Sequence, residues 1–279
     1  MSVLRKMMSI SLTDREKAIS WLLIGAIFFA MRSCEYLKTS GEETKRTKII
    51  RLRNVIFKKG RKVLFHDNPD LENADLVQIT FEYQKNDKRD VKIHMFKSGD
   101  KLLCPVIAWA TTIRRLRNIS SATDNTEVCT FQDDKGKISL LQAVHVRSRL
   151  RAIVTLLGME ELGFDKDDIG LHSIRSGGAM AMFLSGISVI VIQRVGRWSS
   201  EAFLEYIREQ VESFTLDVSK NMLKYEEFMN LNTERTSSQL VLEEDEMESE
   251  NENGPESVPF RINFNSLSLN SNGNEKVNK

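Results

Sequence analysis

The chain has 279 residues, of which 40 are Lys or Arg and 39 are Asp or Glu, so its formal net charge is only +1. Residues 232–279 carry four basic and ten acidic side chains, a net charge of −6, which leaves 36 basic against 29 acidic residues and a net charge of +7 for residues 1–231. A chain of this length can bury a sizeable core. A basic body with an acidic tail suits a polyanion-binding domain that carries a solvated appendage.

Cysteine content and hydropathy exclude several classes of protein. The three cysteines, Cys34, Cys104 and Cys129, are odd in number and stand at no metal-ligand spacing, so we expect a reducing compartment and neither a disulfide framework nor a zinc site. The basic segment Met1–Lys6 lacks the apolar core and cleavage site of a signal peptide. The longest apolar run, Ala18–Met31, is shorter than the roughly 20 residues that cross a bilayer, so we expect no membrane partner.

The first half of the chain predicts one buried helix and a small antiparallel sheet. Thr13 and Asp14, followed by Glu16, are typical of a helix start. The run that continues to Met31 is hydrophobic on all sides, as in the central helix of a large domain. Alternating and β-branched residues, separated by turn signals at Lys59-Gly60 and at 86–88, predict strands within residues 49–65, 75–84 and 90–96.

The second half is predicted to be helical up to residue 231. The expected helices are Val106–Arg117 after Pro105, Leu140–Leu157, one carrying His172 and Arg175, a β-branched one between Gly186 and Val195, and an amphipathic one over 212–231. From Asn232 the composition is that of a disordered segment. We therefore expect a mainly α domain with a small antiparallel β-sheet (α+β) over residues 10–231, an N-terminal extension over 1–9 and a disordered acidic tail over 232–279.

Polar residues far apart in the chain form a set with a possible common chemistry. Two arginines, a lysine and a histidine are what a protein needs to hold a phosphodiester and neutralise the charge that develops on it, and a tyrosine beside them is a candidate nucleophile. The set is Arg32, Lys85, His172, Arg175, Trp198 and Tyr206. Taken singly, each has an ordinary interpretation: Tyr206 and Trp198 as core residues, and Arg32 as an ion-pair partner of Glu35. The conjunction of six residue types in this order favours the catalytic interpretation.

Two strings around these residues resemble the arginine boxes of the tyrosine recombinase (phage integrase) family. They are GAIFFAMRSCEYL at 25–37 and LHSIRSGGAMAMFLSGISVIVIQRVGRWSSEAFLEYIRE at 171–209. The wording QKND at 84–87, LLCPV at 102–106 and GRWSSEAFLEYI at 196–207 is most similar to eukaryotic mobile-element recombinases of the Crypton or DIRS type. The resemblance covers roughly Leu12 to Gln210.

The resemblance implies the fold of the family's catalytic domain and a role for each residue. Tyr206 would form a 3′-phosphotyrosine, and Arg32 and Arg175 would hold the non-bridging oxygens of the phosphate. Lys85, on a β-hairpin, would protonate the leaving 5′-oxygen. His172 would assist proton transfer, and Trp198 would bind the phosphate through its indole N–H. The partners would be double-stranded DNA and further copies of the chain in the nucleus, and the chemistry needs no metal and no cofactor.

A basic segment between Arg32 and Lys85 favours contacts with the phosphates of a duplex. This basic segment runs from Lys45 to Lys62. It contains no acidic residue and nine basic ones: Lys45, Arg46, Lys48, Arg51, Arg53, Lys58, Lys59, Arg61 and Lys62. A solvated strand face is the ordinary alternative. Arg114, Arg115 and Arg117 are expected to extend this basic track.

Two other activities fit the same residues. The chain could be a DNA-binding protein that derives from a mobile element and no longer recombines, or a type IB topoisomerase-like enzyme that nicks and closes DNA. Only about eleven residues precede the start of the resemblance, whereas the family carries an N-terminal core-binding domain. We therefore expect a fragment, or a chain with reduced function.

Overall fold

The computed structural model describes residues 1–39, 47–84 and 89–198, and its elements have the mixed α and β character that the sequence predicts. The chain divides into two units, Met1–Val218 and Ser219–Lys279, and all described residues lie in the first. The helices are α1 (Ser2–Ser9), α2 (Asp14–Phe28), α3 (Ser33–Tyr36), α4 (Pro105–Arg117), α5 (Ala143–Leu157), α6 (Met159–Leu162), α7 (His172–Leu184) and α8 (Val189–Gly196). The strands are β1 (Val55–Lys59), β2 (Lys62–Leu64), β3 (Leu76–Tyr83), β4 (Arg89–Phe96), β5 (Thr130–Gln132) and β6 (Ile138–Leu140), with short 3-10 turns at Leu52–Asn54 and Leu71–Asn73.

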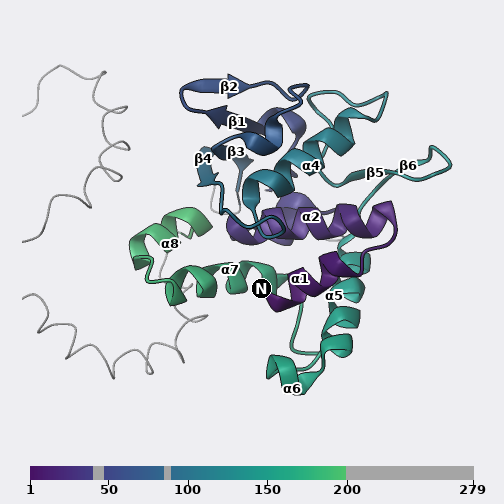
Figure 1. The fold of residues 1–279 in the computed structure, drawn as a ribbon, viewed down its shortest axis with the longest axis vertical. Coiled ribbons are helices and arrows are strands. Elements are labelled where there is room, and N and C mark those ends of the chain that lie inside the picture. Colours follow the sequence, from purple (N-terminus) through teal and green to yellow (C-terminus); the bar gives the residue numbers. More distant parts are fainter. Residues whose placement is uncertain (40–46, 85–88, 199–279) are drawn as a thin grey trace, which may run out of the picture. The chain divides into compact units, whose positions relative to one another are not determined.

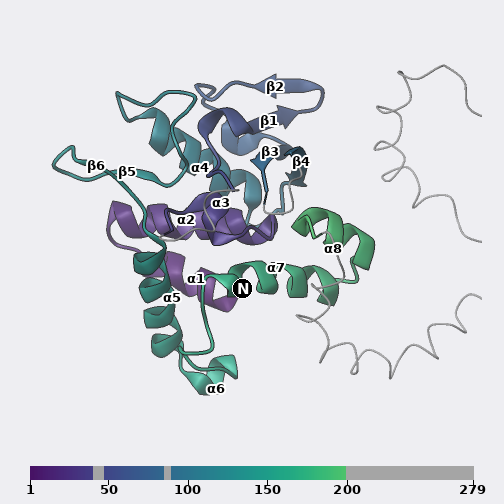
Figure 2. The same ribbon diagram turned by 180° about the vertical axis from the view of Figure 1, so that it is seen from behind.

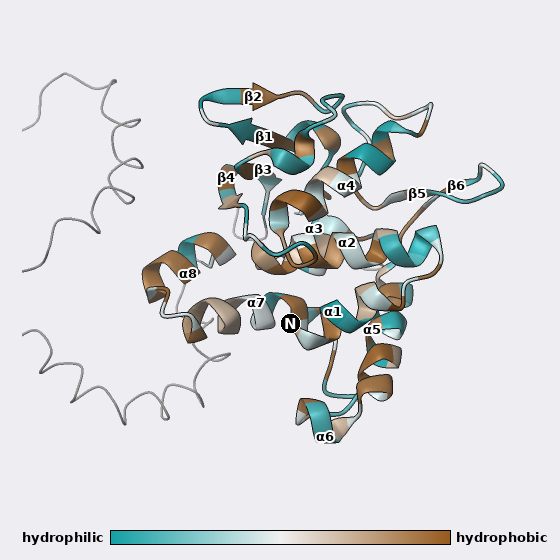
Figure 3. Ribbon diagram, in the orientation of Figure 1, coloured by the Kyte–Doolittle hydropathy of each residue, from teal (hydrophilic) through white to brown (hydrophobic). Residues whose placement is uncertain are grey.

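Helix α2 is the central element, as predicted. Its start is a capping box in which the backbone N–H of Glu16 donates to the Thr13 hydroxyl (3.2 Å) and the Glu16 carboxylate accepts from the Thr13 N–H (3.1 Å). The helix packs against α1, α4 and α7, and it lies between α4 and α7 in both views (Figures 1 and 2). Apolar residues occur along it (Figure 3). Of the helices described, none is both long enough and apolar enough to span a membrane.

The central helix ends at Phe28, three residues before the end that we predicted. Ala30 has a φ of +42°, and the chain then turns into α3. Helix α7 lies close to this end, since a Cβ at Gly178 would lie 2.4 Å from the carbonyl oxygen of Ile27, and Arg175 of α7 donates to the carbonyl oxygen of Ala30. Tertiary contact with α7 therefore replaces a last helical turn that hydrophobicity alone would have continued.

The predicted antiparallel sheet is confirmed and has the strand order β2-β1-β3-β4. Strands β1 and β2 are joined at Gly60, whose φ of +55° suits a tight turn. Phe57 of β1 pairs with Val77 of β3, and Ile79 of β3 pairs with Ile93 of β4. These inward residues join the core next to α4, while β5 and β6 form a separate pair that was not predicted.

The start of α5 and the N-terminal segment differ from the prediction. The helix expected over Leu140–Leu157 begins at Ala143, because the chain up to Leu140 is the strand β6. Helix α1 contributes the buried side chains of Leu4 and Met7 to the same core as α2. The segment that we expected to be an extension is therefore part of the packed domain.

Replacing Gly178 with Ala should push α7 away from α2, because the new Cβ would meet the backbone oxygen of Ile27 at 2.4 Å. We expect a loss of roughly 1–3 kcal/mol in the free energy of unfolding, the usual cost of overpacking. Urea unfolding followed by circular dichroism measures it. Gly177→Ala is the matched control, since a Cβ there meets nothing within 4 Å, and it should stabilise the helix by roughly 0.5–1 kcal/mol. Equal effects of the two substitutions would contradict this account of the contact.

Candidate active site

Arg32 stands at the N-cap position of α3 and is held by Glu35 three residues later. Its backbone N–H donates to Oε2 of Glu35 (2.7 Å), and its guanidinium Nη1 donates to Oε1 of the same carboxylate (3.2 Å). The Arg32 side chain is 21% exposed, whereas that of Glu35 is 1% exposed. Arg32 is therefore anchored on a buried carboxylate and still reaches solvent.

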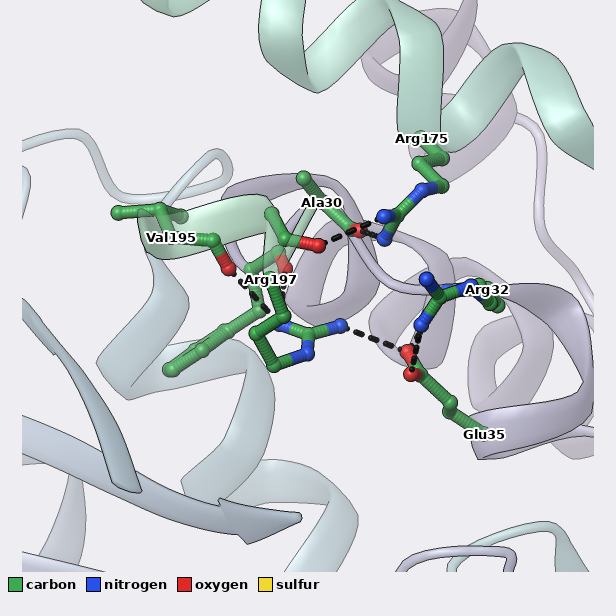
Figure 4. Close-up of polar contacts among 8 residues, drawn as sticks. Ala30, Arg32, Glu35, Arg175, Val195 and Arg197 are labelled. Atoms are coloured by element: carbon green, nitrogen blue, oxygen red, sulfur yellow. Dashed lines mark hydrogen bonds and ion pairs between the residues drawn. The ribbon is translucent and has the colours of Figure 1, made fainter. Parts of the chain in front are cut away.

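Glu35 has a second and fully buried partner, Arg197. Nη2 of Arg197 donates to Oε2 of Glu35 at 2.8 Å, and both side chains are 1% exposed. Nη1 of Arg197 donates to the carbonyl oxygens of Phe29 (3.0 Å) and Val195 (2.8 Å) (Figure 4). The guanidinium also lies over the ring of Phe81, with Cζ 3.6 Å from the ring centroid. One buried ion pair thus joins the end of α2, α3, the end of α8 and β3.

Arg175 lies on α7 and is almost wholly buried. Its Nη1 donates to the carbonyl oxygen of Ala30, and its Nη2 donates to that of Gly196 (2.6 Å). Figure 4 shows the side chains of Arg175 and Arg32 extending from α7 and α3 into the same part of the molecule. The fold therefore brings the two predicted arginines together.

Trp198 packs against Arg175 immediately after α8. Its ring centroid lies 4.0 Å from Cζ of Arg175, a cation–π geometry. The ring is 9% exposed and belongs to a small cluster with Ala30, Ala179 and Ile192. The ring also occupies the space beside Gly196, where no side chain would fit.

His172 is the first residue of α7, one turn before Arg175. The pKa of its imidazole lies below the ordinary 6.5, first because of partial burial and then because of the positive charges of Arg175 and Arg32. His172 shares the first turn of α7 with Arg175, and Figure 4 shows Arg175 and Arg32 extending into the same region, although Arg32 comes from a distant part of the sequence. A neutral imidazole beside two fixed cations is suited to proton transfer near neutral pH.

The other two predicted catalytic residues, Lys85 and Tyr206, lie outside the described residues, as do Lys45 and Arg46. In sequence Lys85 falls between the paired strands β3 and β4. The two tyrosines that the structure describes are Tyr36, whose complete burial raises its pKa, and Tyr83, whose ring centroid lies 4.4 Å from Nζ of Lys48 and 5.1 Å from Cζ of Arg89. Burial makes Tyr36 unsuitable as a nucleophile.

The basic segment divides into exposed and engaged residues. Lys59, Arg61 and Lys62 lie exposed on the hairpin formed by β1 and β2, where Lys58 is half-buried. Arg53 is engaged by the fold, because its Nε donates to Glu82 (2.9 Å) and its Nη1 donates to Asn125. A phosphate contact by Arg53 would have to compete with that carboxylate.

The three α4 arginines, which we expected to extend the basic track, all have partners within the fold. Arg114 donates to Glu72 and to the carbonyl oxygen of Pro69. Arg115 donates to the carbonyl oxygens of Thr130 (2.7 Å) and Val128 (3.5 Å), and Arg117 donates to Asp124 (2.6 Å). Their guanidinium groups hold loops onto α4, which a helix-period pattern does not reveal.

The three cysteines lie inside the fold and are not paired with one another. Cys34, Cys104 and Cys129 are buried free thiols. Among residues 1–39, 47–84 and 89–198, no group of three or more His, Cys, Asp and Glu side chains is placed to hold a metal ion.

Sequence reasoning missed Arg197. The residue adopts a left-handed backbone conformation (φ +58°, ψ 39°) that usually favours glycine, and its partner Glu35 is far away in the chain. Neither property leaves a signal in the local sequence, so the residues around Arg197 do not predict its role. The ion pair between Arg32 and Glu35, which was the ordinary interpretation of Arg32, is present.

Comparison with solved structures identifies the architecture. The XerH site-specific recombinase bound to a palindromic difH substrate, in a post-cleavage complex, superposes with a TM-score of 0.50 at 14% identity. The fold is that of a tyrosine recombinase catalytic domain. The match covers 78% of this chain and 50% of that one, so the chain spans about half the length of the XerH protein.

Two further structures have lower scores. A pre-cleavage complex of XerH gives a TM-score of 0.47 at 15% identity, covering 76% of this chain and 49% of that one. The Tn1549 transposon integrase in complex with transposon right end DNA gives 0.43 at 10% identity, covering 78% and 63%. No protein-family model matches the chain, and a search of curated proteins finds no match.

Replacing Arg32 with Met should raise the pKa of His172, because one of the two cations that lower it is removed. NMR titration of the histidine side chains in the full chain measures this, with His172→Gln to assign the signal. In the parent protein the pKa of His172 should lie below 6.5, so its contribution to stability is present above the pKa of the unfolded state and is lost as the pH falls from there through the lower pKa of the folded state. Lys59→Met, on the β1–β2 hairpin, removes a charge elsewhere and should leave the titration unchanged. An unchanged His172 pKa in the Arg32 variant would show that the two side chains do not lie together in solution.

Proposed function

We propose that this chain is the catalytic domain of a tyrosine recombinase of mobile-element origin, which cuts and rejoins double-stranded DNA through a covalent 3′-phosphotyrosine intermediate. The observation that carries the proposal is the convergence of Arg32, His172 and Arg175 from α3 and α7, with Trp198 stacked on Arg175. A structural ion pair would need only one of these arginines. The second cation and the neutral imidazole are what a developing phosphorane requires.

The described geometry divides the work between the two arginines. Arg175 is fixed by two backbone carbonyl oxygens and by the Trp198 ring, so it is a preorganised positive charge that needs no reorganisation when substrate binds. The Arg32 guanidinium makes one hydrogen bond to Glu35 and is partly exposed, which leaves N–H groups for the non-bridging oxygens of a phosphate.

The proposed reaction conserves bonds and protons. The phenolic oxygen of Tyr206 attacks the phosphorus, and the bond from phosphorus to the 5′-oxygen breaks. Lys85 gives a proton to the departing 5′-oxygen, and His172 assists removal of the phenol proton. Religation is the reverse reaction with a second 5′-hydroxyl, so no external energy source is needed.

The proposed partners follow from charge. The exposed Lys59, Arg61 and Lys62 on the β1–β2 hairpin would contact duplex phosphates, with Lys48 near Tyr83 at the end of β3. Recombination of two duplexes requires further copies of the chain, and a target in chromosomal DNA implies the nucleus. Similarity to Crypton or DIRS-type recombinases is part of this proposal and rests on the sequence strings alone.

Incubation with a nicked duplex whose 5′ fragment diffuses away should yield a covalent protein–DNA adduct in the absence of magnesium. The adduct accumulates because religation has lost its acceptor. Tyr206→Phe should abolish it, since the substitution removes the nucleophilic oxygen and keeps the ring. Denaturing gel electrophoresis detects the adduct, and mass spectrometry locates it.

Tyr83→Phe and Tyr225→Phe are the matched controls and should retain the adduct. An adduct that persists in Tyr206→Phe, or that maps to another tyrosine, would reject the assignment of the nucleophile. Joining of strands from two duplexes, rather than closure of one, separates recombination from a topoisomerase-like activity.

Replacing the bridging 5′-oxygen with sulfur should rescue cleavage by Lys85→Ala. A thiolate is a good leaving group and needs no general acid, whereas the negative charge on the phosphorane still needs Arg32. The same substrate should therefore leave Arg32→Ala impaired by roughly 100-fold or more. Initial cleavage rates on the oxygen and sulfur substrates measure the difference. Equal rescue of both variants would remove the general-acid role from Lys85.

A further inference from the structure

We infer that Arg197 is a positioning residue for Arg32: it balances the buried charge of Glu35 so that the Arg32 guanidinium stays available to a phosphate. The inference rests on the proposed function, because it assigns Arg32 to the scissile phosphate. Arg197 itself is 1% exposed and does not touch the substrate in this account.

The two oxygens of the Glu35 carboxylate have different sets of donors. Oε2 of Glu35 accepts from Nη2 of Arg197 (2.8 Å) and from the backbone N–H of Arg32 (2.7 Å). Oε1 accepts from Nη1 of Arg32 at 3.2 Å, the longest of the three contacts. Arg197 thus occupies the oxygen that a bidentate pair between Glu35 and the Arg32 guanidinium would need.

Arg197 and Arg32 both carry a positive charge next to the buried carboxylate of Glu35. A buried carboxylate needs a compensating cation. Arg197 supplies one, so the trio of Arg32, Glu35 and Arg197 carries a net positive charge that remains for an anionic ligand. Without Arg197, Arg32 would be the one cation among the described residues in contact with Glu35, and two parallel hydrogen bonds to the carboxylate would compete with those to a phosphate.

The Arg197 side chain is fixed in the fold, so it would not move with Arg32 when a ligand binds. Two carbonyl oxygens, of Phe29 and Val195, hold its Nη1, and the ring of Phe81 covers its guanidinium. Phe81 lies on β3, the strand that leads in sequence to Lys85. The guanidinium of Arg197 therefore contacts both Glu35, the partner of Arg32, and β3, the strand that precedes the proposed general acid in sequence.

The test compares three variants of the full chain with the parent protein. Arg197→Met leaves the charge of Glu35 to Arg32, and Arg197→Met with Glu35→Gln removes both charges of the buried pair. Arg197→Lys keeps the charge but replaces the planar guanidinium, whose two terminal nitrogens bond different partners, with a single ammonium nitrogen. Arg194→Met is the matched control, because it removes an exposed cation from the same helix and does not contact Glu35.

We expect Arg197→Met to lower the rate of strand cleavage by about ten- to a hundredfold, the usual cost of misplacing a catalytic group by about 1 Å, with less than about a threefold change in duplex affinity. The double variant should recover most of that loss. In an Arg32→Met background, Arg197→Met should cause no further loss in cleavage, because its effect passes through Arg32. Thermal unfolding of every variant separates these effects from loss of the fold.

A second readout does not depend on cleavage. The Nε–Hε NMR signal of Arg32 should shift in Arg197→Met, return towards its original position in the double variant and stay unchanged in Arg194→Met. If the parent chain fails to cleave DNA but the Arg32 signal behaves in this way, the proposed function fails and the positioning role stands. If the Arg32 signal does not move in Arg197→Met, or if cleavage losses are additive with Arg32→Met, the positioning role is wrong.

Discussion

The buried carboxylate of Glu35 is the point on which the candidate site depends. Its two oxygens accept from Arg32 and Arg197, and both Glu35 and Arg197 are 1% exposed. Removing one partner of such a pair leaves an uncompensated charge in the interior, at a cost of about 3–5 kcal/mol. The ends of α2 and α8, helix α3 and strand β3 all meet at this group, so its geometry fixes where the predicted phosphate ligands lie.

The two arginines of the site differ in a way that bears on mechanism. The Arg175 guanidinium is held by hydrogen bonds to the carbonyl oxygens of Ala30 and Gly196 and by contact with the face of the Trp198 ring. It is therefore both a structural cation and a proposed phosphate ligand, and a loss of activity on substituting it would mix folding with chemistry. Arg32 is the cleaner probe, because Glu35 keeps Arg197 as a partner when Arg32 is removed.

Local signals predicted the elements that local physics determines. The capping residues Thr13 and Glu16, the apolar run of α2 and the turn at Gly60 all gave correct elements, and the α+β fold is confirmed. The local sequence did not predict features that depend on distant contacts. Helix α2 ends at Phe28, where α7 lies close to its last turn, and the arginines of α4 bond to segments far away in the chain.

The candidate site shows the same division between near and distant partners. The bond between Arg32 and Glu35 spans three residues and was expected, whereas the bond between Glu35 and Arg197 spans 162 residues and was missed. Arg32, His172 and Arg175 were recognised from the order of residue types rather than from any property of each residue alone. Lys85 and Tyr206 remain predictions from the sequence, because they lie outside the described residues.

A crystal structure of the full chain with duplex DNA tests the central claim most directly. The account predicts that the non-bridging oxygens of one phosphodiester lie within hydrogen-bond distance of both Arg32 and Arg175, near His172, while Arg197 keeps its bond to Glu35. A phosphate bound only along the β1–β2 hairpin, with the Arg32 guanidinium still confined to Glu35, would contradict it.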